Sequence, residues 1–154
     1  MVRTVGDIVS EYSLRSCVRC GICDSVCPSG RNGGIYPESV LFSMLTADPS
    51  SDMPELRSAV WKCLMCHRCT MACPEGLDVT GAIRAMRYDS VSSGEPPKRF
   101  KMASDTLTEC GRTFPVNDKV RQKREELGLN DIKEDAAAIN ELRIIMSRTG
   151  FLHE

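Results

Sequence analysis

The chain has 154 residues and a formal net charge of −1, so it can form one domain, or one domain with an extension, but not two full-sized cores. It lacks the surplus of positive charge that proteins binding nucleic acid or anionic membranes carry. No apolar run approaches the length of a membrane span, and the first residues lack the apolar core of a secretory signal. These features predict a cytoplasmic protein that has no membrane span and binds no nucleic acid.

The first predicted element is an amphipathic helix near the amino terminus. Thr4 and Asp7 resemble a capping box, in which each residue satisfies a backbone N–H of the first helical turn. The predicted apolar face consists of Val2, Val5, Ile8, Val9 and Tyr12.

Two motifs of four cysteines follow, both with the pattern Cys-x2-Cys-x2-Cys-x3-Cys-Pro. The first motif comprises Cys17, Cys20, Cys23 and Cys27, and the second comprises Cys63, Cys66, Cys69 and Cys73. Each position in the second motif lies 46 residues after its counterpart in the first, and the correspondence continues to Gly30 and Gly76. In a reducing compartment, clustered thiols are more often metal ligands than disulfide partners. The repeat therefore predicts a duplicated metal-binding unit.

The spacing of the cysteines favours a pair of [4Fe–4S] clusters. Two residues between successive thiolates let a short turn wrap one corner of a cubane, so that three sulfurs reach three irons. In two-cluster ferredoxins the fourth cysteine, which precedes proline, ligates the other cluster. We therefore expect one cluster on Cys17, Cys20, Cys23 and Cys73, and the other on Cys63, Cys66, Cys69 and Cys27.

Structural zinc is an alternative, because eight thiolates could bind two tetrahedral ions. Zinc sites usually pair two separated Cys-x2-Cys turns and need no three-thiol run that ends in Cys-Pro, so the spacing favours iron–sulfur. Iron–sulfur clusters can serve electron transfer, structure or sensing. Two closely spaced clusters favour electron transfer, since one would suffice for a structural role.

The rest of the chain has helical periodicity and no convincing strand, which predicts an all-α fold. Pro37 suits a helix start and Pro49 a stop. Asp52 and Glu55 bracket the start of another helix, and Asp78 can cap a third. The predicted inward residues are Val40, Leu41, Met44 and Leu45; Leu56, Val60 and Trp61; and Val79, Ala82, Ile83 and Met86.

A break at Ser90–Pro97 predicts a two-cluster domain over residues 1–93 and a helical C-terminal extension over residues 94–154. In the extension, Asn117 is a predicted helix cap, and Gly150 suits a Schellman-type end. The predicted apolar stripes are Phe100, Ala103, Leu107 and Cys110; Val120 and Leu127; and Ile132, Ala136, Ile139, Leu142 and Met146.

The charge of the extension reverses along its length. Residues 98–124 carry eight basic and three acidic side chains, whereas residues 125–154 carry three and seven. Short amphipathic helices are marginal alone, so the extension must pack on the cluster domain, on a partner, or on both. We expect it to dock partner subunits.

Three further observations concern chemistry. Cys110 lies outside the motifs on a predicted apolar face, which favours an inert thiol over a reactive one. His67 lies within the second motif and is expected beside a cluster, not as a ligand, since each cluster already has four thiolates. The sequence contains no nucleotide-binding glycine loop, nucleophile–base pair or H-E-x-x-H motif, so no catalytic residue is expected.

Charged residues near the motifs predict unequal cluster potentials. Lys62, His67 and Arg68 flank the second motif, whereas Arg19 and Asp24 roughly cancel beside the first. Positive charge favours the reduced, more negative state, so we expect the higher potential at the second motif.

Two such cysteine motifs across a helical spacer resemble the α-helical ferredoxin domain, which also occurs, in modified form, in iron–sulfur subunits of succinate dehydrogenase and fumarate reductase. The chain more closely resembles the C subunit of heterodisulfide reductase. This resemblance rests on chain length, on the segments CVRCGICDSVCPSGR and CLMCHRCTMACPEGLDVTGAIRAMR, and on FPVNDKVRQKREELGL and INELRIIMSRTGF in the extension. It covers nearly the whole chain, and all eight ligand positions are present.

The resemblance implies an electron-transfer subunit with two [4Fe–4S] clusters and no substrate site. It also implies two partners: a flavin- and cluster-bearing A subunit, and a catalytic B subunit that reduces the mixed disulfide of coenzyme M and coenzyme B in methanogenic archaea. One alternative is the iron–sulfur subunit of another anaerobic dehydrogenase or of a fumarate reductase-like complex. An alternative of another class is a structural zinc protein or a cluster-based sensor.

Overall fold

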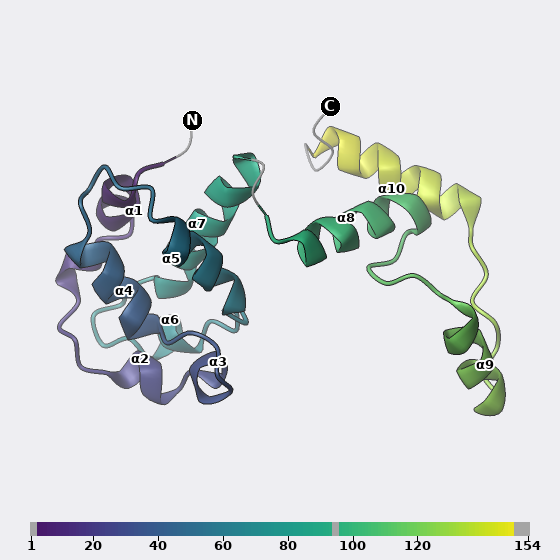
Figure 1. Ribbon diagram of the computed structural model, residues 1–154, viewed down its shortest axis with the longest axis horizontal. Helices are drawn as coiled ribbons and strands as arrows, with labels where there is room; N and C mark the ends of the chain where they lie inside the picture. Colours follow the sequence, from purple (N-terminus) through teal and green to yellow (C-terminus); the bar gives the residue numbers. More distant parts are fainter. Residues whose placement is uncertain (1–2, 94–95, 150–154) are drawn as a thin grey trace. The chain divides into compact units, whose positions relative to one another are not determined.

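The computed structural model describes residues 3–93 and 96–149, and every regular element in these ranges is helical (Figure 1). The elements are α1 (Val5–Glu11), the 3-10 helix η1 (Leu14–Ser16), α2 (Ile22–Ser25), α3 (Pro28–Arg31), α4 (Pro37–Thr46), α5 (Pro54–Ala59), the 3-10 helix η2 (Val60–Lys62), α6 (Arg68–Ala72), α7 (Val79–Ser92), α8 (Lys98–Cys110), α9 (Asp118–Glu126) and α10 (Ala136–Arg148). The predicted all-α fold is confirmed. Of the helices described, none is both long and apolar enough to cross a lipid bilayer.

The chain divides into two compact units, residues 1–97 and 98–154. In the first unit, α1 packs on α4 and α7, and α5 and η2 pack on α7. The most deeply buried apolar residues of this unit are Val5, Ile8, Leu14, Val40, Val60, Val79, Ala82, Ile83 and Met86. Burial of one such aliphatic side chain stabilises the fold by about 1.5–3 kcal/mol. The short helices α2 and α3 lie at the end of the unit away from α1 (Figure 1).

The predicted caps at Thr4 and Asp78 are confirmed, and α4 begins at Pro37 as predicted. The Thr4 hydroxyl accepts the Asp7 N–H at 3.2 Å, and the Asp7 carboxylate accepts the Thr4 N–H at 2.7 Å, which completes the capping box of α1. The Asp78 carboxylate accepts the Gly81 N–H at 2.8 Å and caps α7. Val2, predicted on the apolar face of α1, lies outside the described residues.

The predicted helix start between Asp52 and Glu55 is confirmed, because α5 begins at Pro54. Met53, with a left-handed φ of 46°, directly precedes α5 and has no side-chain cap. The Asp52 carboxylate instead pairs at 2.8 Å with the buried Arg57, whose guanidinium also donates to the backbone carbonyl of Arg3. The acidic residue therefore neutralises a buried cation and does not cap the helix.

The predicted break at Ser90–Pro97 begins later than expected, because α7 continues to Ser92. Asp89 and Ser90 are both buried. The Asp89 carboxylate lies 3.2 Å from the Arg3 guanidinium, and the Ser90 hydroxyl donates to the Met86 carbonyl at 2.9 Å. These satisfied polar groups extend the helix past the point where the composition alone suggests a linker.

In the second unit, described through Thr149, α8 packs on α10. Met146 is buried, Ile139 and Leu142 are half-buried, and the Arg143 guanidinium donates to the Thr108 carbonyl at 3.0 Å. Two residues of the predicted α10 stripe do not belong to it. Ile132 precedes the helix, and Ala136 is exposed at its first position.

Short polar side chains cap the starts of α9 and α10 in the second unit. The Asn117 amide oxygen accepts the Val120 N–H at 3.0 Å, as predicted. The Asp135 carboxylate accepts the N–H groups of Ala137 and Ala138 at the start of α10. The predicted Schellman end at Gly150 lies outside the described residues.

Candidate metal centre

The two cysteine motifs fold in the same way. In each, a 3-10 helix ends directly before the first cysteine: η1 before Cys17 and η2 before Cys63. A short α-helix then carries the third cysteine, Cys23 on α2 and Cys69 on α6. The 46-residue repeat in the sequence is therefore a repeat in the structure as well.

Both motifs turn through left-handed backbone at matching positions. Arg19 and Met65 have φ values of 54° and 52°, and Gly21 and His67 have φ values of 74° and 61°. A left-handed conformation costs a non-glycine residue about 1–2 kcal/mol, and such strained positions concentrate at functional sites. The turns curl each motif so that its first three thiols face one cavity.

The first cavity, together with its opening to solvent, has about 380 Å³ of empty space and is lined by thiols from both motifs. Three come from the first motif and one from the second: Cys17, Cys20, Cys23 and Cys73. Leu41, Leu77 and Val79, all buried, form part of its apolar wall. Glu38, at the start of α4, also lines it.

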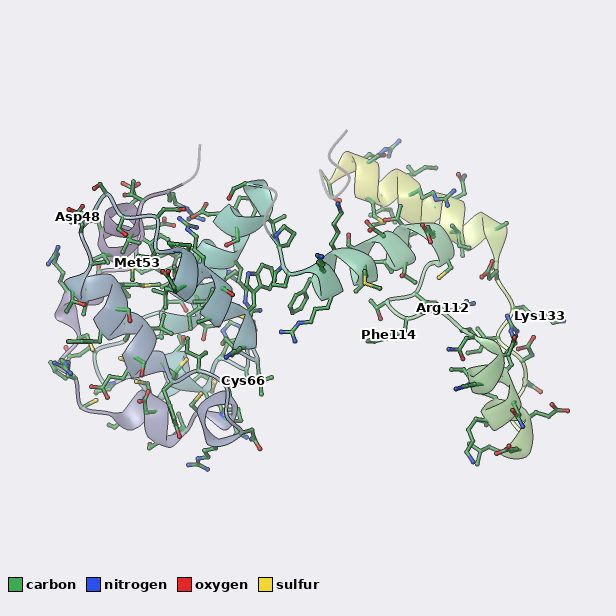
Figure 2. All side chains as sticks on the ribbon, viewed as in Figure 1. Asp48, Met53, Cys66, Arg112, Phe114 and Lys133 are labelled. Carbon is green, nitrogen blue, oxygen red and sulfur yellow. The ribbon has the colours of Figure 1, made fainter. Side chains whose placement is uncertain are left out.

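The second cavity, together with its opening to solvent, has about 360 Å³ of empty space; three of its thiols come from the second motif and one from the first. Its cysteines are Cys63, Cys66, Cys69 and Cys27, and its lining also includes Ile83 and Thr80 of α7. In Figure 2, Cys66 lies at the end of the unit remote from Asp48 and Met53. Each four-cysteine set assigned from the sequence thus lines one cavity.

The exchange of the fourth cysteines follows from the Cys-Pro backbone. Cys27 (φ −80°, ψ 112°) and Cys73 (φ −70°, ψ 119°) are extended, and each precedes a proline that disfavours helical backbone in the residue before it. The short helix of each motif therefore ends before that cysteine, α2 at Ser25 and α6 at Ala72. Because α2 packs against α6, the fourth cysteine of each motif lies beside the cavity of the other.

All nine cysteines are free thiols. In the described ranges, no three His, Cys, Asp or Glu side chains are placed to bind one metal ion. The four thiols of each set instead surround a cavity. This donor set of four sulfurs fits a cubane, which takes one thiolate at each iron.

Burial disfavours the thiolate form of two of these cysteines by raising the pKa of their thiols. Burial, followed by the charge of the adjacent Asp24, raises the pKa of Cys23 to about 12. Burial also raises the pKa of Cys63, although the Met65 N–H and the positive charge of Arg87 oppose the shift. Metal binding requires thiolates, so it must displace these protons.

Arg87 is a supporting residue that the sequence analysis did not identify. Its guanidinium donates to the Val60 carbonyl at 2.8 Å and to the Cys63 carbonyl at 2.5 Å, and it lies 5.0 Å from the Trp61 ring centroid. It therefore links α7 to the start of the second motif. No local pattern could identify it, because its contacts are 24–27 residues away in sequence.

The other residues considered from the sequence lie outside the thiol sets. Lys62, His67 and Arg68 are exposed, and the Arg19 guanidinium lies 3.6 Å from the Glu38 carboxylate. Cys110 lies on α8 in the second unit, where its half-buried thiol donates to the Thr106 carbonyl at 3.2 Å.

Comparisons with known proteins agree with this geometry. A family model described as a 4Fe-4S dicluster domain matches residues 13–77, which include both motifs. The C subunit of the ferredoxin:CoB-CoM heterodisulfide reductase of Methanosarcina mazei is 31% identical over 142 residues, covering 88% of this chain and 85% of that protein. The C subunit of the H(2):CoB-CoM heterodisulfide,ferredoxin reductase of Methanothermobacter thermautotrophicus is 25% identical over 150 residues, covering 90% of this chain and 76% of that protein.

The C subunit of the ferredoxin/F(420)H(2)-dependent CoB-CoM heterodisulfide reductase of Methanosarcina acetivorans is 32% identical over 148 residues, covering 90% of this chain and 86% of that protein. The dicluster domain and the eight thiols mean that the chain binds two [4Fe–4S] clusters and transfers electrons through them. It does so as one subunit of an oxidoreductase complex. Because C subunits that are 31–32% identical align with 88–90% of its length, this chain belongs to the family of heterodisulfide reductase C subunits.

Proposed function

We propose that this chain is a cytoplasmic electron relay between two other subunits of a heterodisulfide reductase complex. Electrons would enter from a flavin- and cluster-bearing A subunit, and leave to a catalytic B subunit. The observation that best supports this proposal is the pair of cavities beside the contact between α2 and α6, each lined by four thiols. A bound cubane supplies one-electron redox chemistry.

The ligand assignment is part of this proposal. Cys17, Cys20, Cys23 and Cys73 hold one cluster, and Cys63, Cys66, Cys69 and Cys27 hold the other. The thiols of Cys23 and Cys69 are close enough that a charge on Cys69 raises the pKa of Cys23. This proximity supports a short hop between clusters across α2 and α6.

The disulfide substrate is inferred from the relatives. Their names describe reductases of the CoB-CoM heterodisulfide, so we assign reduction of that disulfide to the catalytic B subunit of this complex. No catalytic residue is assigned to the present chain, whose role is to hold both clusters and to contact each partner. Co-purification of the native complex, with its subunits identified by mass spectrometry, tests this assignment. A flavoprotein dehydrogenase for a small organic acid as the sole partner would favour the fumarate reductase-like alternative.

Metal analysis tests the cofactor content directly. Anaerobically purified native protein is expected to contain about eight irons and eight acid-labile sulfides per chain, from two cubanes on eight thiolates. It should be brown, with broad absorption that bleaches on reduction. Stoichiometric zinc with negligible iron would support the structural alternative and contradict the relay.

A further inference from the structure

The two halves of the cluster domain share a second structural repeat behind the cysteines. The residue after the third cysteine, Asp24 in one half and Thr70 in the other, accepts a backbone N–H from the first turn of the next long helix. The Asp24 carboxylate accepts the Glu38 N–H of α4 at 2.7 Å, and the Thr70 hydroxyl accepts the Thr80 N–H of α7 at 3.0 Å. The positions are equivalent, but their chemistry is not.

In the first half, a carboxylate lies beside a ligand sulfur. Asp24 Oδ1 is 3.7 Å from Cys23 Sγ, and the free thiol donates to it. When Cys23 ligates iron it has no proton to donate, so the carboxylate then faces a negatively charged sulfur. Reduction adds a negative charge to this cluster, and the Asp24 carboxylate repels that charge, so the cluster is harder to reduce.

In the second half, a hydroxyl lies beside the equivalent sulfur. Thr80 Oγ1 is 3.4 Å from Cys69 Sγ, and both residues are buried. The Thr70 hydroxyl donates to Thr80 Oγ1 at 3.0 Å, and the Asp78 carboxylate is its alternative acceptor at 3.2 Å, so Thr80 does not donate to Thr70. The Thr80 proton is therefore available to the Cys69 thiolate, and a donor to sulfur stabilises the reduced cluster.

Backbone donors add to this difference. The Met65 N–H lies 3.4 Å from Cys63 Sγ, and the Gly30 N–H lies 3.4 Å from Cys27 Sγ, so the second thiol set receives two further hydrogen bonds. For the first set, the only sulfur contact among the described hydrogen bonds is the one from Cys23 to Asp24.

We propose that Asp24 and Thr80 set the order of the two cluster potentials, with Asp24 lowering that of the Cys17 cluster and Thr80 raising that of the Cys63 cluster. This inference rests on the proposed ligand sets. It gives the relay a direction, because electrons move favourably from the Cys17 cluster to the Cys63 cluster. It also assigns the effect to two positioning residues in contact with sulfur, in addition to the exposed charges of Lys62, His67 and Arg68.

The test is a redox titration of the full-length chain, purified anaerobically with both clusters and followed by electron paramagnetic resonance. Asp24→Asn removes the charge but keeps an oxygen for the Glu38 N–H, and should raise only the lower midpoint potential. Thr80→Val removes the hydroxyl at nearly constant volume, and should lower only the higher midpoint potential. Cys66→Ala, which should disturb only the second cluster, assigns each midpoint to its ligand set.

Matched controls separate tuning from general perturbation. Thr80→Ser restores the hydroxyl and should return the wild-type midpoint, and Asp48→Asn removes an exposed carboxylate far from Cys66 and should shift neither (Figure 2). The tuning proposal would be overturned if both clusters were present and neither midpoint moved, if a midpoint moved in the direction opposite to that predicted for its variant, or if both variants shifted the same cluster. If the Thr80→Val variant loses a cluster, the midpoint potentials of the Asp24→Asn variant alone test the proposal. If Cys66→Ala disturbs both clusters equally, the ligand assignment fails, and with it the proposed function.

Discussion

Replacing Cys27 by alanine is expected to damage the cluster held by Cys63, Cys66 and Cys69, and to leave the cluster at Cys17 largely intact. The Cys27 thiol is buried in the second cavity although it belongs to the first motif. Loss of one of four thiolates leaves an iron without its protein ligand. The iron content should fall from about eight toward about four per chain.

Reference variants make this result specific. Cys20 and Cys66 are the exposed members of the two sets, so alanine at either position disturbs little packing. The electron paramagnetic resonance spectrum of reduced Cys27→Ala should match that of Cys66→Ala, and the spectrum of Cys73→Ala should match that of Cys20→Ala. Cys110→Ala is the control and should retain the full iron content, since Cys110 lines neither cavity. A Cys27→Ala spectrum that matched Cys20→Ala would disprove crossed ligation.

Truncation after Gly94 is expected to preserve the clusters but abolish stable association with the partner subunits. All eight motif cysteines lie before this point. So do nearly all of the buried apolar residues described, since Met146 is the one buried apolar residue among residues 98–149. The second unit exposes several large apolar side chains: Met102, Phe114, Leu127, Leu129 and Ile145. Such surface is typical of interaction sites, which supports a docking role for the extension.

The measurement compares iron content and partner affinity of the fragment with those of the full-length chain. Near-full iron with at least a tenfold rise in Kd, about 1.4 kcal/mol, is expected. A fragment that binds the catalytic partner with normal affinity and accepts electrons at the normal rate would exclude docking through the extension. A fragment that fails to fold would show instead that the extension covers the cluster domain.

Local patterns predicted the helices well where the relevant contacts are local. The Thr4–Asp7 capping box and the Asp78 cap join residues three apart, so their spacing in the sequence is already their geometry. One prediction was inaccurate where a distant partner contributes. The helix α7 continues to Ser92, into the expected break, and its buried Asp89 is neutralised by Arg3, 86 residues away in sequence.

The sequence by itself determined the class of cofactor and the all-α fold, because cluster ligands are read from spacing along one chain and helices from short-range periodicity. Only the tertiary structure decided which side chains lie against each ligand sulfur. The Thr80 hydroxyl reaches the Cys69 sulfur across 11 residues, and the Arg87 guanidinium reaches the backbone carbonyl of Cys63 across 24, because α7 packs against both α6 and η2. Such contacts depend on how helices pack, and packing depends on the whole core and not on any one segment.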